Sequence, residues 1–172
     1  AALQEPHIVP VLNAGVTTDG LPFYTMPLVP GDSLRARIQA GPVALDESVE
    51  ILRNLAQALA YAHDHGVVHR DIKPANVLLS SGTAVVTDFG IAKALAAAGP
   101  GGELTLTEAG SSLGTPAYMA PEQHDGKPAD ALSDQFSFCV SLYESLHGRR
   151  PFPGQTAGEI AGETAVHTGD LT

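Results

Sequence analysis

The fold of this chain is decided by the stretch His69-Arg70-Asp71-Ile72-Lys73-Pro74-Ala75-Asn76, which is followed a short hairpin later by Asp88-Phe89-Gly90. Together these segments supply two carboxylates, one amide and one ammonium group at two adjacent turns. Carboxylate and amide oxygens are hard ligands that suit magnesium, and a lysine ammonium suits a phosphate group. The stretch therefore predicts a site for a divalent cation and a polyphosphate.

The same stretch resembles the catalytic loop of protein kinases, because it has the form H-R-D-x-K-x-x-N and is followed by D-F-G. Residues 114–122 add a third element of that family, since they read Gly-Thr-Pro-Ala-Tyr-Met-Ala-Pro-Glu and contain A-P-E. D-F-G alone recurs by chance, but here the elements agree in order and spacing. Lys73 and the Gly-Thr-Pro-Ala-Tyr wording are similar to serine/threonine kinases. The chain as a whole looks most like the eukaryotic-like serine/threonine kinases of bacteria.

This resemblance implies an α+β fold made of the end of a small β-rich lobe and most of a larger, helical lobe. Residues 1–26 would be the C-terminal part of the small lobe, 27–32 the hinge and 33–172 the truncated large lobe. The catalytic loop would span 69–76 and the activation segment 88–122. The resemblance starts after the glycine-rich loop, the strand lysine and the helix glutamate of the family, so these 172 residues are expected to be a fragment.

Composition and charge narrow the possible partners and the compartment. Nine basic against 19 acidic residues give a net charge of −10, so no positive field is available to hold nucleic acid or an anionic membrane. Cys139 is the only cysteine, which excludes an internal disulfide, fits a reducing compartment and predicts a buried, inert thiol between Phe138 and Val140. The sequence shows no membrane-spanning stretch and no signal peptide, so the cytosol is expected, with any membrane anchor outside this chain.

Local signals predict the order of helices and strands. The expected elements are a helix end (1–5), a strand (7–12), a turn (13–15), a strand (23–26), two helices (34–40 and 46–65), two strands (77–79 and 84–86), a helix (133–147) and a helical turn (157–166). The predicted N-caps are Ser33 and Asp46, and the predicted helix ends are Gly66 and Gly148. Ser81-Gly82 is the expected hairpin turn.

Apolar residues at three- and four-residue steps predict which helix faces are buried. The predicted buried positions are Val49, Leu52, Ala56 and Leu59 on the first long helix, and Phe136, Val140, Tyr143 and Leu146 on the second.

The resemblance assigns the chemistry of the site residue by residue. Asp71 would be the catalytic aspartate that accepts and orients the substrate hydroxyl, and Lys73 would neutralise charge on the γ-phosphate of ATP. Asn76 and Asp88 would bind Mg²⁺. Without the family context, a turn-capping aspartate and a solvated surface lysine are the ordinary alternatives.

The resemblance also implies that adenine is held by the backbone of the hinge. The contacts would be the carbonyl of Pro27 and the N–H and carbonyl of Val29, with Met26 at the back wall of the pocket. An ordinary loop containing Pro30-Gly31 is the alternative interpretation.

Regulation is expected at Arg70, because an arginine beside the catalytic aspartate leaves a positive charge in need of a partner. In kinases of this type the partner is a phosphate group on the activation loop. Thr105 and Thr107 are the first candidates for phosphorylation, with Ser111 and Ser112 next. Thr115 would form hydrogen bonds with Asp71 and Lys73 when the loop is ordered.

Four more residues would have structural roles by the same resemblance. His69 and Phe89 would pack inward under the site, and Asp134 would accept hydrogen bonds from the catalytic-loop backbone. Glu122 would pair with an arginine beyond Thr172, so that partner is expected to be missing here. In His63-Asp64-His65 the two histidines are two residues apart, so they do not share a helix face and no zinc site is expected.

The sequence thus predicts an ATP- and Mg²⁺-dependent protein kinase acting on serine and threonine hydroxyls of proteins and regulated by activation-loop phosphorylation. This fragment itself is expected to be inactive, because both the glycine-rich loop and the strand lysine are needed for transfer. The alternative is a pseudokinase or partner-binding module on a kinase fold. The combination of Asp71, Lys73, Asn76 and Asp88 argues against it, because a binding module has no need of all four.

Overall fold

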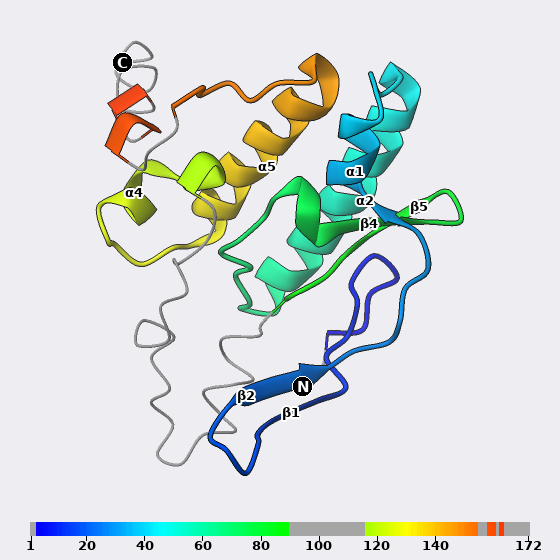
Figure 1. Cartoon of the computed structure of the whole chain (residues 1–172), viewed down its shortest axis with the longest axis vertical. Helices are drawn as coiled ribbons and strands as arrows, with labels where there is room; N and C mark the ends of the chain where they lie inside the picture. The colour runs from blue at the N-terminus through cyan, green and yellow to red at the C-terminus, as the bar shows by residue number, and fades with distance from the viewer. Residues whose placement is uncertain (1–2, 90–115, 155–157, 161, 164–172) are drawn as a thin grey trace.

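The computed structural model describes residues 3–89, 116–154, 158–160 and 162–163 (Figure 1). Its elements are, in order, β1 (Asn13–Val16), β2 (Pro22–Thr25), β3 (Asp32–Ser33), α1 (Leu34–Gln39), α2 (Leu45–Asp64), the 3₁₀ turn η1 (Pro74–Asn76), β4 (Val77–Ser80), β5 (Thr83–Val86), the 3₁₀ turn η2 (Pro116–Tyr118), α4 (Pro121–His124) and α5 (Ala131–His147). The long helices α2 and α5 pack together as the body of the molecule, and the β1–β2 pair lies apart at the lower end of the view. This mixture of small antiparallel sheets and helices confirms the expected α+β class.

The N-terminal residues depart from the predicted elements. β1 and β2 form an antiparallel pair, so the segment predicted as a turn at 13–15 is a strand. The predicted strand at 7–12 is reduced to an isolated parallel bridge between Ile8 and Val86. Residues 3–5 are not helical. Gly15 fits inside β1 because the ring of Phe23 lies over it, where a Cβ atom would come within 2.9 Å.

The β4–β5 hairpin forms as predicted and sets the geometry of the site. Val77 pairs with Val86, and Ser81 and Gly82 have positive φ angles of 51° and 80°, as a type I′ hairpin turn requires. The hairpin brings the residues that flank its two strands together, and the N–H of Thr87 donates to the carbonyl of Asn76 at 2.9 Å. Asn76 and Asp88 therefore lie at the same end of one hairpin.

The helix ends follow the capping signals in all but one case. Ser33 caps α1 by accepting from the N–H of Ala36, Gly66 follows the end of α2 with a φ of 69°, and Gly148 ends α5 with a φ of 66°. The prediction that Asp46 caps α2 is wrong, because the helix begins at Leu45 with Ala44 as its N-cap. Asp46 instead lies in the first turn, where the helix dipole favours a negative charge.

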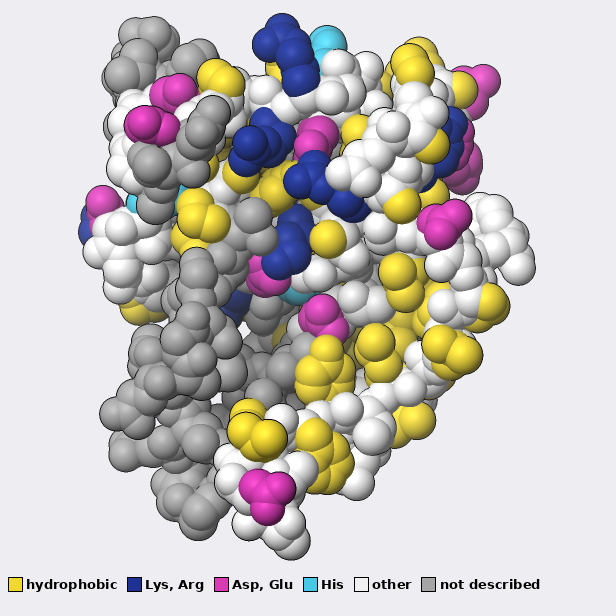
Figure 2. Space-filling view, in the orientation of Figure 1, with side chains coloured by type: hydrophobic (Ala, Val, Ile, Leu, Met, Phe, Trp, Pro, Cys, Tyr) yellow, Lys and Arg dark blue, Asp and Glu magenta, His cyan; other side chains and the backbone are white. Residues whose placement is uncertain are grey.

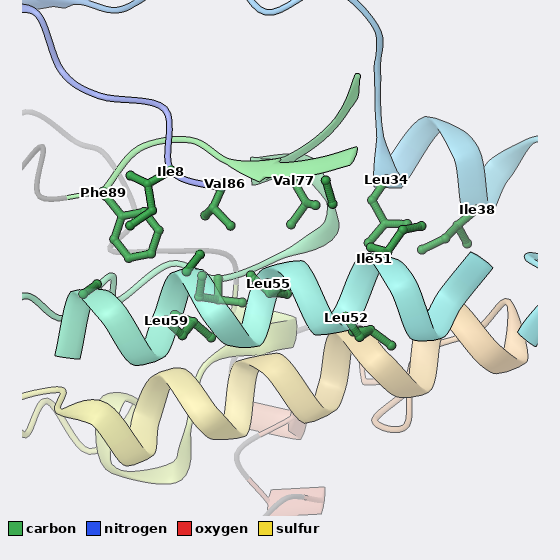
Figure 3. Close-up of a cluster of buried hydrophobic side chains, with 14 of the residues drawn as sticks. Ile8, Leu34, Ile38, Ile51, Leu52, Leu55, Leu59, Val77, Val86 and Phe89 are labelled. Atoms are coloured by element: carbon green, nitrogen blue, oxygen red, sulfur yellow. The ribbon is translucent and has the colours of Figure 1, made fainter. Parts of the chain in front are cut away.

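The buried face of α2 is turned relative to the predicted one. Leu52 and Leu59 are buried, but Val49 is 44% exposed and Ala56 is also exposed. The reason is that α2 packs against β5 on one side and α5 on another, which favours a different stripe of the helix. That stripe is formed by Ser48, Ile51, Leu52, Leu55, Ala58, Leu59 and Ala62. Figure 3 shows Ile8, Val77, Val86 and Phe89 meeting it from the side of the strands.

The buried face of α5 is largely polar, contrary to the prediction from apolar spacing. Of the four predicted positions only Val140 is buried, and Leu146 is 40% exposed. The buried stripe is instead Ser133, Ser137, Ser141 and Ser145. The hydroxyls of the last three each donate to the carbonyl four residues earlier, at 2.8–3.0 Å. A serine whose hydroxyl is satisfied within its own helix is small and costs little to bury.

Two further surface features bear on the sequence predictions. Cys139 is exposed on α5, so the expectation of a buried thiol is wrong. None of the helices in the described part of the chain is long and apolar enough to cross a membrane. The predicted helical turn at 157–166 is partly described, and residues 158–160 and 162–163 are helical.

Candidate active site

The catalytic loop gathers its polar side chains around Asp71. Lys73 Nζ donates to Asp71 Oδ2 at 2.6 Å, and Asn76 Nδ2 donates to the same oxygen at 3.1 Å and to the Asp71 carbonyl at 2.8 Å. Ile72, which is fully buried, anchors the loop in the core between Asp71 and Lys73. The side chains of Asp71 and Lys73 stay 34% and 20% exposed, so the ion pair is accessible from solvent.

The hydrogen bonds of Asn76 assign the two ends of its amide. Nδ2 donates to Asp71, so Oδ1 is the end of the side chain with the lone pairs that a cation requires. Asn76 is buried within η1, where Pro74 starts the 3₁₀ turn. The turn therefore presents a rigidly held carbonyl oxygen.

Asp88 follows β5 in a left-handed backbone conformation, with a φ of 69°. Its Oδ1 accepts a hydrogen bond of 2.9 Å from the hydroxyl of Tyr24 on β2. Burial, followed by the hydrogen bond and the charge of Asp88, raises the pKa of the Tyr24 hydroxyl. Sequence reasoning missed Tyr24, because nothing in its local sequence marks a partner 64 residues away.

His69 is buried under the site, and its ring contacts three neighbouring residues. Its Nε2 lies 2.8 Å from the carbonyl of Thr87, and its Nδ1 accepts from the N–H of Asp71 at 3.2 Å. These partners require a neutral ring with the proton on Nε2, and burial lowers the pKa of His69 in agreement. The ring of Phe89 packs edge-on against it at 4.6 Å between centroids. Both side chains lie inward, as expected.

Asp134 holds the backbone of the catalytic loop from the first turn of α5. Its Oδ2 accepts from the N–H of His69 and its Oδ1 from the N–H of Arg70, both at 2.8 Å, so the expected hydrogen bonds are present. Oδ2 also lies 2.8 Å from Nε2 of His63 on α2. His63 thus has a carboxylate partner. In the described ranges, no three His, Cys, Asp or Glu side chains are grouped so that they could hold a metal ion together.

Arg70 is held through its backbone on both sides. Its N–H donates to Asp134, its carbonyl accepts from Gln123 Nε2 at 3.1 Å, and its φ is 74°. Gln123, just after Glu122, is a contact that sequence reasoning missed. The predicted partners of Arg70, namely Thr105, Thr107, Ser111 and Ser112, and also Thr115 and Gly90, lie outside the described residues.

Glu122 has a partner on α5. The hydroxyl of Ser133 donates to Glu122 Oε1. This contact joins the segment that follows η2 to the first turn of α5, next to Asp134.

The hinge residues lie at the surface in this structure. Met26 is 40% exposed and Pro27 is also exposed, so the predicted back wall of an adenine pocket is open to solvent. Val29 is half-buried. Gly31 is the one hinge residue under a strict steric limit, since its φ is +125° and an added Cβ would lie 2.0 Å from the carbonyl oxygen of Leu79. The adenine contacts of Met26, Pro27 and Val29 stay predictions.

A charged network centred on the buried Glu144 lies beside η2 and was not predicted. Arg35 Nη1 on α1 donates to Glu144 Oε1 at 2.6 Å, and the hydroxyl of Tyr118 donates to Glu144 Oε2 at 2.5 Å. Glu144 is only 4% exposed. The network joins α1, η2 and α5. No sequence signal reveals it, because Arg35 and Glu144 are 109 residues apart.

Three comparisons place the chain among known proteins. Residues 1–168 match the family described as protein kinase domain. Serine/threonine-protein kinase PknB of Mycolicibacterium smegmatis is 42% identical over 166 residues, covering 94% of this chain and 26% of the relative. Probable serine/threonine-protein kinase PknB of Lactococcus lactis is 41% identical over 163 residues, covering 94% and 25%. The chain therefore spans about a quarter of the length of these curated relatives.

The fold has a solved counterpart as well. The crystal structure of the M. tuberculosis PknI kinase domain superimposes with a TM-score of 0.69 and 29% sequence identity, covering 87% of this chain and 52% of that one.

Proposed function

Because this chain belongs to the protein kinase family, we propose that it is the hinge and catalytic part of a protein serine/threonine kinase, which transfers the γ-phosphoryl group of ATP to hydroxyls of proteins. Residues 1–26 are the end of the small lobe, 27–32 the hinge and 33–172 the large lobe. The observation that carries this proposal is the contact of Asp71 with both Lys73 and Asn76. It concentrates a carboxylate, an ammonium and an amide at one accessible point.

Asp71 accepts a hydrogen bond from the substrate hydroxyl and orients it toward the phosphorus atom. The hydrogen bonds from Lys73 and Asn76 hold the carboxylate in one orientation, and its partial exposure leaves it open to a protein substrate. Phosphoryl transfer needs positioning and charge neutralisation more than covalent help from the protein. Lys73, already beside Asp71, supplies a positive charge for the γ-phosphate.

The residues at the end of the β4–β5 hairpin fit a magnesium ion. Asp88 offers a carboxylate and Asn76 offers an amide oxygen, and such oxygen donors suit a hard cation. Asn76 and Asp88 would hold Mg²⁺ there, and the ion would supply positive charge that neutralises the phosphate groups during transfer. The nucleotide then lies between this point and the hinge, where Pro27 and Val29 contact adenine through the backbone and Met26 forms the back wall.

Regulation acts through Arg70 and the activation segment. A phosphate on Thr105 or Thr107 pairs with the Arg70 guanidinium, and Thr115 then bonds with Asp71 and Lys73. Support for this part comes from the backbone of Arg70, which two flanking hydrogen bonds fix in place.

A substitution series in the full-length gene product tests the function. Asp71→Asn removes the acceptor for the substrate proton, so kcat for phosphorylation of a generic protein substrate should fall about 10²- to 10⁴-fold. Asp64→Asn, at an exposed position on α2, is the matched control and should keep kcat unchanged. Equal kcat values for the two variants would reject Asp71 as the catalytic aspartate, and no transfer by any variant would favour a binding module.

The 172 residues alone make a second test. They contain neither the glycine-rich loop nor the strand lysine, and both are required for transfer. We expect no phosphoryl transfer from radiolabelled ATP above the Asp71→Asn background. Ordinary kinase turnover by residues 1–172 would contradict this part of the proposal.

A further inference from the structure

The hydrogen bond between Tyr24 and Asp88 joins the β1–β2 pair, which lies at the lower end of Figure 1, to the end of the β4–β5 hairpin. Tyr24 lies on the β1–β2 pair, and Asp88 lies at the end of the β4–β5 hairpin. Within β2, Phe23 and Thr25 are exposed, and Tyr24 is the half-buried residue. The ring of Tyr24 thus reaches from the strand that leads into the hinge down to the catalytic hairpin.

The contact has the chemistry of a support for a metal ligand. A tyrosine hydroxyl is protonated at neutral pH, so it donates to the carboxylate. It occupies Oδ1 of Asp88, and each carboxylate oxygen has its own lone pairs, so Oδ2 can bind a cation while Tyr24 keeps its hydrogen bond. Partners that hydrogen-bond to a metal ligand fix its orientation, and their loss typically weakens metal binding 10- to 100-fold.

The backbone of Asp88 makes such a support necessary. Its φ of 69° is an uncommon conformation for a residue other than glycine. The preceding residue is tied to the loop, since the N–H of Thr87 donates to the carbonyl of Asn76. The backbone therefore places Cα of Asp88, and the hydroxyl of Tyr24 restricts where the carboxylate points.

We propose that Tyr24 is a positioning residue, which holds the Asp88 carboxylate in the orientation that binds the divalent cation. This inference rests on the proposed function, because it takes Asp88 as a ligand of that cation. Through Tyr24, the cation site is linked directly to β2. That strand ends two residues before Pro27, the predicted adenine contact. Figure 2 shows hydrophobic side chains gathered over the β1–β2 region, and the hydroxyl of Tyr24 carries a polar contact from this region to Asp88.

The test measures cation binding, with no turnover involved. Mn²⁺ is titrated into the chain in the presence of ADP, and free Mn²⁺ is followed by electron paramagnetic resonance. Tyr24→Phe removes only the hydroxyl and should weaken Mn²⁺ binding 10- to 100-fold. Tyr143→Phe makes the same change on α5, where the ring packs on His147, and should leave the affinity unchanged.

Asp88→Asn separates this inference from the proposed function. If Asp88→Asn binds Mn²⁺ as tightly as the unsubstituted chain, the metal role of Asp88 fails, and the role of Tyr24 fails with it. If Asp88→Asn loses Mn²⁺ while Tyr24→Phe binds it unchanged or more tightly, only the role of Tyr24 fails. Loss in both variants, with Tyr143→Phe unchanged and all far-ultraviolet circular dichroism spectra alike, supports both.

Tyrosine emission gives a second readout. The chain has no tryptophan and four tyrosines, so its fluorescence reports on the tyrosines alone. Cation binding at Asp88 changes the charge next to the Tyr24 hydroxyl, and we expect Mg²⁺ with ADP to change the emission. The change should persist in Tyr143→Phe and vanish in Tyr24→Phe. An equal change in both variants would overturn the inference.

Discussion

The hydroxyl of Tyr118 donates a 2.5 Å hydrogen bond to the carboxylate of Glu144, and both side chains are buried. The same carboxylate binds Arg35, so the helix α1 and the turn η2 meet at one buried charge on α5. Burial, together with the hydrogen bond and charge of Glu144, raises the pKa of the Tyr118 hydroxyl well above its ordinary value. Ionisation of Tyr118 should therefore make the stability of this packing depend on pH.

Stability should fall at high pH because of Tyr118. Its pKa is raised in the folded state, so its contribution is fully present below the unfolded value of 10.0 and decreases as pH rises above that value. The midpoint of urea unfolding should drop between pH 8 and pH 10.5, and the drop should be smaller in Tyr118→Phe. A drop of equal size in both proteins would assign the effect to other groups.

Removing the Tyr118 hydroxyl should itself destabilise the fold at neutral pH. Glu144 is buried, so the lost hydrogen bond leaves one of its oxygens under-satisfied, at a cost of about 1–3 kcal/mol. Chemical unfolding of Tyr118→Phe at pH 7 measures this cost. Tyr143→Phe, whose ring packs on His147, serves as control and should lose much less. A loss as large in Tyr143→Phe would show that the hydroxyl of Tyr118 is not the cause.

His69 should make the fold sensitive to mild acid. Its pKa is lowered in the folded state, chiefly by burial, so its contribution to stability is fully present above the unfolded value of 6.5 and is lost as pH falls below that value. Protonation of Nδ1 would also place a second donor against the N–H of Asp71. Unfolding free energy should decrease from pH 7.5 to pH 5.5, and this decrease should shrink in His69→Asn but not in His147→Asn, at an exposed position.

Gly31 and Gly41 form a matched pair for testing backbone constraint in the hinge region. Both have positive φ, at 125° and 139°, but only Gly31 has a neighbour within the space of an added Cβ. Gly41→Ala should cost about 1–3 kcal/mol through backbone strain alone. Gly31→Ala should cost more, because its Cβ would lie 2.0 Å from the Leu79 carbonyl oxygen. Equal losses in urea unfolding would show that the hinge can move away from β4.

Asp134→Ala should be among the most damaging single changes in the large lobe. It leaves the backbone N–H groups of His69 and Arg70 without their acceptor in a buried place, and we expect a loss of about 3–5 kcal/mol. Thermal unfolding measures it. Asp125→Ala, which removes an exposed carboxylate paired with Lys127, is the control and should change the unfolding temperature little. A mild effect of Asp134→Ala would mean that water replaces the carboxylate.

Much of the site was predictable because its signals are local. Three features depend on only a few neighbouring residues. They are the contacts among Asp71, Lys73 and Asn76, the turn at Ser81-Gly82 and the cap at Ser33. The predicted neighbourhood of Asn76 and Asp88 then followed from the hairpin alone. Short-range chemistry of this kind survives in the folded chain, since the residues involved cannot move far from one another.

The rest was not predictable because it depends on which elements meet. Tyr24 and Asp88 are 64 residues apart, and Arg35 and Glu144 are 109 apart, so no local pattern marks either pair. Apolar spacing also misplaced the buried face of α5, because it counts Ser137 and Ser141 as polar although their hydroxyls are satisfied within the helix. Asp46 failed as a cap because α2 starts one residue before it.

The contact of Gln123 with Arg70 has a separate consequence. Gln123 reaches the carbonyl of Arg70 and not its guanidinium, so a substitution at position 70 deletes the charge and leaves the tether intact. The charge of the side chain at position 70 can therefore be changed independently of the hydrogen bond that holds its backbone. A substitution of Arg70 would alter how this loop binds a negative group, while Gln123 would still hold the peptide group that precedes Asp71.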